Sequence, residues 1–161
     1  SIGAVTSLTL PDGQSEGIAR GVSADGMVVA GDMRTPTNVN SGFHWSESGG
    51  FINLGANTLV NAISADGTTV VGTGINENMA YRWTNDYGIR SLGSLDGGPF
   101  GEALDVSGDG SVIVGIASGT SGGAFVWDAA DGMRSLTTVM EDGGVDLSGW
   151  NISGAVGISA D

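Results

Sequence analysis

The chain has 161 residues, of which 40% are hydrophobic, and this is enough apolar surface for an ordered domain. Eighteen acidic and five basic residues give a net charge of −13, which excludes nucleic acid and anionic membrane surfaces as expected partners. Without cysteine there is no disulfide framework and no thiol nucleophile, and no apolar run is long enough to span a membrane.

A repeat of about 42 residues organises the chain. Each copy contains a turn of the form Ser-x-Asp-Gly, then an apolar pair and a glycine, then an aromatic residue two positions before a tryptophan. The turn residues are Asp25, Gly26, Asp66, Gly67, Asp109 and Gly110. Asp-Gly between apolar stretches predicts a β-hairpin, in which the glycine accepts the positive φ of the turn and the aspartate stabilises it.

Each copy is expected to form four short strands, since no segment shows convincing helical periodicity. Four antiparallel strands in about 42 residues are typical of a β-propeller blade. We therefore predict an all-β fold, a β-propeller-like array of about three and a half four-stranded blades in a single domain. A β-solenoid is the rival architecture.

The predicted units follow one another along the chain. Residues 1–10 are expected to be the last strand of a preceding blade, and residues 17–55, 58–93 and 102–137 are three repeats. Residues 138–151 form an insertion, and residues 152–161 are expected to be the first strand of an incomplete repeat. Blade edges left open in such an array tend to pair with another chain, so we expect copies of the protein to associate with one another. The alternative is that the two terminal segments combine within one chain into a makeshift blade.

The aromatic residues of the repeat lie two positions apart and so project from the same face of a strand. Because they recur in every unit, we expect them to be core residues and not platforms for sugar rings. They are Phe43, Trp45, Tyr81, Trp83, Phe125 and Trp127.

The pattern resembles the bacterial HAF repeat, a probable extracellular repeat. The resemblance runs from Val5 to Asp161 and rests on the Ser-x-Asp-Gly turn, the Val-Val-Gly strand and the Ala-Phe-x-Trp strand, although the sequence His-Ala-Phe itself is degenerate here. It implies export to the periplasm, the cell surface or the medium. It implies no activity, substrate or catalytic residue.

Few residues point to catalysis. His44 is the single histidine, and its counterparts in the repeat are Arg82 and Val126, so we interpret it as a surface residue on the strand face opposite Trp45. Paired carboxylates could act as a general acid and base, as in a glycosidase. We nevertheless expect no enzyme activity, no catalytic residue and no cofactor, because most carboxylates occupy turns.

The insertion contains the weaker candidates for a site. Asp142 and Asp146 belong to its acidic cluster and are the residues most suited to a cation such as calcium, although no calcium-binding loop motif is present. Trp150 lies outside the repeated aromatic positions and is expected to be an exposed contact for a ligand or partner.

These observations favour an extracellular or cell-surface structural or adhesive binding module that presents a rigid propeller surface. Its expected partners are other copies of itself and proteins or glycans at a surface. The alternatives are a carboxylate-dependent, glycosidase-like hydrolase and a glycan-binding lectin propeller.

Overall fold

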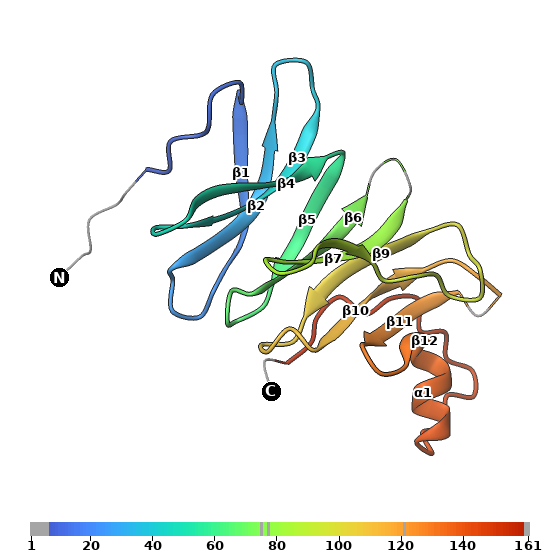
Figure 1. The fold of residues 1–161 in the computed structure, drawn as a ribbon. Coiled ribbons are helices and arrows are strands. Elements are labelled where there is room, and N and C mark those ends of the chain that lie inside the picture. Colours follow the sequence, from blue (N-terminus) through green and yellow to red (C-terminus); the bar gives the residue numbers. More distant parts are fainter. Residues whose placement is uncertain (1–6, 75, 77, 121, 160–161) are drawn as a thin grey trace.

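The structure, a computed structural model, describes residues 7–74, 76, 78–120 and 122–159. Within these residues, twelve strands form three four-stranded antiparallel sheets, and one short helix follows the last strand (Figure 1). Each sheet is a meander in which consecutive strands are neighbours. The three sheets pack together in the manner of propeller blades, which confirms the predicted all-β, propeller-like fold.

The strands of the three sheets are bounded as follows. The first sheet contains β1 (Glu16–Val22), β2 (Val28–Arg34), β3 (Asn40–Ser46) and β4 (Gly50–Ala56). The second contains β5 (Thr58–Ile63), β6 (Thr69–Gly74), β7 (Met79–Thr84) and β8 (Gly88–Ser91). The third contains β9 (Gly101–Val106), β10 (Val112–Ala117), β11 (Gly123–Asp128) and β12 (Gly132–Ser135).

The first strand of every sheet carries a β-bulge, an extra residue that interrupts the pairing with the second strand. In β5 the extra residue is Asn61, because Val60 pairs with Gly72 and Ala62 pairs with Val71. Arg20 in β1 and Leu104 in β9 occupy the same position. The sheets therefore repeat an irregularity as well as a strand pattern.

The bulge explains the glycine that follows the apolar pair in each repeat. Gly31, Gly72 and Gly115 lie opposite the three bulges. A Cβ added to them would lie 2.0, 1.9 and 2.0 Å from the nearest carbonyl oxygen of the first strand. No side chain fits so close to a backbone oxygen, so glycine is required at this position in every sheet.

Each interface between successive sheets has its own apolar core. Between the first and second sheets, Ala30 and Leu54 pack with Val60, Val70, Tyr81 and Trp83. Between the second and third sheets, Val71 and Ala80 pack with residues that include Ala103, Ile113, Phe125 and Trp127. Val70 and Val71 thus face opposite neighbours, and this explains why both are apolar although they are adjacent in the chain.

The Ser-x-Asp-Gly turns also connect one sheet to the next. The Ala24 N–H donates to the Ala65 carbonyl at 2.8 Å, and the Asp66 N–H donates to the Gly108 carbonyl at 3.1 Å. Gly110 has a φ of 73°, and a Cβ there would lie 2.3 Å from the Thr69 hydroxyl oxygen. The glycine is therefore required both for the turn and for close packing on the preceding sheet.

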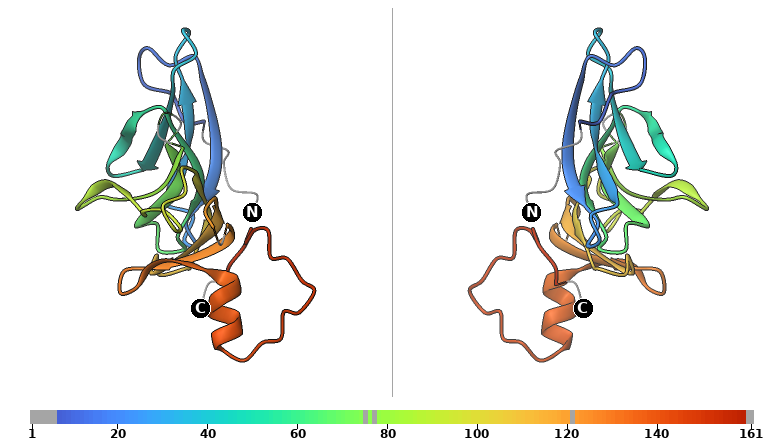
Figure 2. Two further views of the ribbon diagram at one scale, coloured as in Figure 1. Left: turned by 90° about the vertical axis from the view of Figure 1, so that its right-hand side faces the viewer. Right: turned by 90° about the vertical axis from the view of Figure 1, so that its left-hand side faces the viewer.

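The insertion contains the helix α1 (Leu136–Asp142), although no helix was expected. Ser135 is its N-cap and accepts a hydrogen bond from the Thr138 N–H. With seven residues and none of them buried, α1 is too short to show an apolar stripe in the sequence. Figure 2 shows that it projects from the third sheet. No helix among the described residues is long and apolar enough to cross a membrane.

The segment after the helix returns to the third sheet. The Ile152 carbonyl accepts from the Ala124 N–H at 3.0 Å, and the Ala155 N–H donates to the Gly115 carbonyl at 3.3 Å. A Cβ on Gly154 would contact Ile116, which holds the place in the repeat that Asp32 holds in the first sheet. In the first sheet, the face that carries Asp32 is covered by β5. The segment after the helix covers the corresponding face of the third sheet.

The chain ends were predicted to be strands. Residues 7–10 and 152–159 have no strand assigned to them, and residues 1–6 and 160–161 lie outside the described residues.

Candidate functional site

The repeated aspartates stabilise their own turns. The Asp109 carboxylate accepts hydrogen bonds from the Ser111 N–H at 2.9 Å and from the hydroxyls of Ser111 and Ser107, both at 2.7 Å. These bonds lower the pKa of Asp109 to about 2. Asp25 accepts from the Ser23 hydroxyl and the Met27 N–H, and its pKa is lowered for the same reason.

In Asp66, partial burial acts to raise the pKa, but the hydrogen bonds from Ser64 and Thr68 outweigh it and the pKa is lowered. The three carboxylates are thus bound to hydroxyl and amide donors within their turns.

Replacing Asp109 with asparagine is expected to lower the thermal midpoint near neutral pH and to have little effect in strong acid. The folded state favours the ionised carboxylate, so this contribution is present above the ordinary pKa of 3.8 and is lost as the pH falls through the folded value of about 2. Thermal melts of both proteins between about pH 7 and pH 2 test this. A difference in midpoint that does not narrow below about pH 4 would contradict it.

The candidate residues of the insertion are dispersed on the surface. Asp142 and Asp146 are exposed, and Asp146 accepts from the Ser148 N–H. In the part of the chain that the structure describes, no group of three or more His, Cys, Asp or Glu side chains could hold a metal ion. Trp150 is 75% exposed and lines a small hollow beside α1 with Thr138 and Glu141.

Two carboxylates that do not belong to the repeat bind backbone amides. Asp32 is buried, receives the Val60 N–H at 2.7 Å from the next sheet and pairs with Arg20 at 2.7 Å. Asp105 receives the Ile158 N–H at 2.9 Å. Both therefore connect successive parts of the array, a role that the sequence pattern did not indicate because neither residue recurs.

His44 lies between two sheets, so its interpretation as a surface residue is wrong. Its ring centroid is 4.9 Å from that of Trp83 in the next sheet, and its Nε2 lies 3.1 Å from the Gly67 carbonyl oxygen. Arg82, its counterpart, lies 4.8 Å from the ring centroid of Trp127 in the third sheet and forms a cation–π contact. In the first and second sheets, the residue before the tryptophan thus reaches the tryptophan of the following sheet.

His44 and Trp83 line a groove between the first and second sheets, which we call the inter-sheet groove. Its volume is 580 Å³. The first sheet contributes Val28, His44, Ser46 and Ser48, and the second contributes residues 66–68 and 82–87. The groove therefore joins a Ser-x-Asp-Gly turn to the turn between β7 and β8, two segments that the sequence pattern had not connected.

Tyr87 is the residue of the groove that the repeat does not explain. Four residues after the tryptophan of each sheet stand Gly49, Tyr87 and Asp131, so only the second sheet has an aromatic ring there. Tyr87 is 66% exposed. Its departure from the repeat is the signal by which the sequence could have identified this region.

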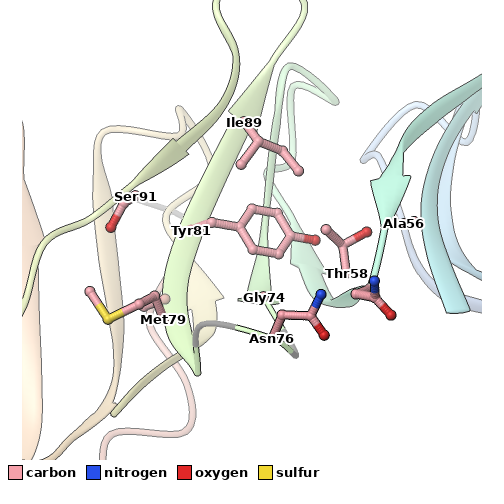
Figure 3. Close-up of a pocket in the computed structure, with 10 residues that line it drawn as sticks. Ala56, Thr58, Gly74, Asn76, Met79, Tyr81, Ile89 and Ser91 are labelled. Carbon is pink, nitrogen blue, oxygen red and sulfur yellow. The ribbon is translucent and has the colours of Figure 1, made fainter. Parts of the chain in front are cut away.

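A second cavity of 220 Å³ lies at the opposite end of the same interface (Figure 3). Tyr81, Thr58 and Asn76 line it, together with apolar residues that include Ile89. The Tyr81 hydroxyl donates to the Leu59 carbonyl at 3.0 Å, and burial together with the Asp32 carboxylate raises the pKa of Tyr81 above its ordinary value. Tyr81 is thus a structural residue of the bulge region.

The predicted aromatic residues are largely buried. Phe43, Tyr81, Trp83, Phe125 and Trp127 are buried, whereas Trp45 is half-buried. The difference follows from position, because the face of the first sheet that carries Val22 has no other sheet on it within the described residues. Val22 is 57% exposed, whereas its counterpart Val106 is 6% exposed. Association between copies through such a face stays a prediction.

Comparisons with known proteins agree with the fold. No family model matches the sequence, and no curated protein matches it. The crystal structure of TolB from Acinetobacter baumannii is similar, with a TM-score of 0.56 and 16% sequence identity. The match covers 80% of this chain and 34% of the TolB chain, so the chain spans about a third of that protein. The chain therefore resembles the TolB β-propeller in fold.

Proposed function

We propose that the chain is a binding module that holds a ligand in the inter-sheet groove. The observation that carries this proposal is Tyr87, an exposed aromatic ring that lines a groove between two packed sheets. Concave sites with a few polar groups and apolar or aromatic surface are where proteins usually bind ligands.

The contrast between residues that recur in the repeat and Tyr87, which does not, supports the proposal. Side chains that recur in the three sheets, such as Trp83 and Asp109, form the cores and the turns. Tyr87 neither recurs nor packs in a core, so stability does not account for it. A module that binds through residues placed on a repeated scaffold would combine these two classes.

Binding is preferred to catalysis because of how the carboxylates are used. Two of the carboxylates that depart from the repeat, Asp32 and Asp105, accept hydrogen bonds from backbone amides. A glycosidase needs one carboxyl group to donate a proton and another to act as nucleophile or base. Carboxylates engaged in strand connections are poorly suited to these roles.

The location proposed for this module is outside the cytoplasm, at the cell surface or in the medium. The support is the resemblance of its repeats to the HAF repeat, which extends over nearly the whole chain. Fractionation of the producing cells, with detection of the chain by antibody, tests this part of the proposal. Recovery in the cytoplasm alone would contradict it.

The binding proposal is tested on arrays that carry glycans and peptides, using the whole chain and two matched variants. Tyr87→Ser removes the ring at the groove, and Trp150→Ser removes an exposed ring elsewhere. We expect binding to at least one class of probe that is lost in Tyr87→Ser and retained in Trp150→Ser. Absence of binding, or binding that is indifferent to Tyr87, would contradict the proposal.

A further inference from the structure

The groove offers one face for stacking and several groups for hydrogen bonding. The exposed ring of Tyr87 is flat and apolar, as is suitable for the C–H face of a pyranose ring. Ser48, Thr84 and Asn85 line the same groove, and their side chains have no hydrogen-bond partner among the described residues. These hydroxyl and amide groups can both donate to and accept from sugar hydroxyls.

A further polar atom at the groove is unpaired. His44 Nδ1 is buried and has no hydrogen-bond partner in the described part of the chain, while Nε2 faces the Gly67 carbonyl. A buried polar atom without a partner is uncommon in proteins. Because Nδ1 is inaccessible to solvent, a hydroxyl group bound in the groove could reach it only after the imidazole ring turned.

The charges distinguish among ligands. Asp86 and Asp66 are acidic, Arg82 is engaged with Trp127, and the whole chain carries a net charge of −13. Anionic sugars are therefore disfavoured. A basic peptide would need several available carboxylates, but the Asp66 carboxylate already accepts hydrogen bonds from Ser64 and Thr68, which leaves Asp86 as the available carboxylate among the lining residues. The neutral groups outnumber the available charges, and this favours a neutral ligand.

We propose that the inter-sheet groove binds a neutral pyranose, with Tyr87 stacking on the sugar ring and Ser48, Thr84 and Asn85 bonding to its hydroxyls. This inference rests on the proposed function, since it names the ligand class of the same groove. It places the contacts on two sheets at once, so the sugar would also bridge the first and second sheets.

The inference is tested by NMR titration of the isotope-labelled whole chain with methyl glycosides of glucose, mannose, galactose and N-acetylglucosamine, up to about 10 mM. We expect at least one sugar to shift the amide signals of Thr68, Asn85 and Tyr87. Tyr87→Ser should weaken binding by about tenfold or more, whereas Tyr87→Phe, which keeps the ring, should weaken it by less than about threefold. Val145→Ser, at an exposed position outside the groove, should leave the affinity unchanged.

A parallel titration with a Lys- and Arg-rich peptide separates the two proposals. Shifts in the groove caused by the peptide and not by any sugar would overturn the carbohydrate inference and leave the binding module intact. Shifts confined to other parts of the chain, equal affinity of Tyr87→Ser and the unaltered chain, or the absence of shifts with every sugar would also overturn the inference. If neither sugar nor peptide binds in the groove, the proposed function fails with it.

Discussion

Replacing Gly72 with alanine is expected to lower the free energy of unfolding by about 3 kcal/mol or more. The new Cβ would lie 1.9 Å from the Leu59 carbonyl oxygen, and it would also approach the Tyr81 hydroxyl at 3.0 Å. Neither the backbone of β5 nor the buried tyrosine ring can move away without disturbing the bulge at Asn61. Urea denaturation followed by tryptophan fluorescence measures the loss.

Gly74 is the matched control, since it lies two residues away in β6. A Cβ on Gly74 would lie 3.8 Å from the nearest atom, an ordinary van der Waals distance. Gly74→Ala should therefore be neutral or stabilise by up to about 1 kcal/mol, because alanine reduces the entropy of the unfolded chain. Similar midpoints for the two variants would show that the close approach at the bulge does not decide this position.

Replacing Trp83 with alanine is expected to cost about 3 to 5 kcal/mol, because the substitution leaves a cavity the size of an indole ring. Trp83 is 5% exposed and lies in the core between the first and second sheets with Leu54 and Val60. Loss of the ring also removes the contact that His44 makes from the neighbouring sheet. The measurement is the urea midpoint and slope of the whole chain.

Trp150→Ala provides the comparison, because it removes the same side chain from an exposed position. Surface substitutions away from caps and networks usually change stability by less than about 0.5 kcal/mol. Equal, small losses for both variants would contradict the assignment of Trp83 to the core.

The exposed ring at Tyr87 and the contact between His44 and Trp83 belong to a region that the sequence pattern did not single out. A histidine whose counterparts are arginine and valine suggests a position without a common role. In the structure the first two of these residues, His44 and Arg82, share one role, because an imidazole and a guanidinium can both lie against an indole ring. The chemistry of the contact recurs although the residue type does not.

The sequence by itself determined the number of strands in each sheet, the turns between them and the faces that the aromatic residues share. These features depend on neighbours in the chain, because Asp109 bonds to groups within two residues of it and strand side chains alternate from one residue to the next. The repeat also made the array visible, since the same local pattern returns in all three sheets.

Only the tertiary structure decided which faces are covered and what lies between the sheets. The neighbours of His44, Asp32 and Gly110 belong to sheets that are separated from them along the chain. The inter-sheet groove likewise joins separate segments of two sheets, from Val28 to Tyr87, and its shape depends on how the two sheets twist and stack. Local conformational propensity carries no information about such contacts. They are set by packing between sheets and not by interactions inside a single strand or turn.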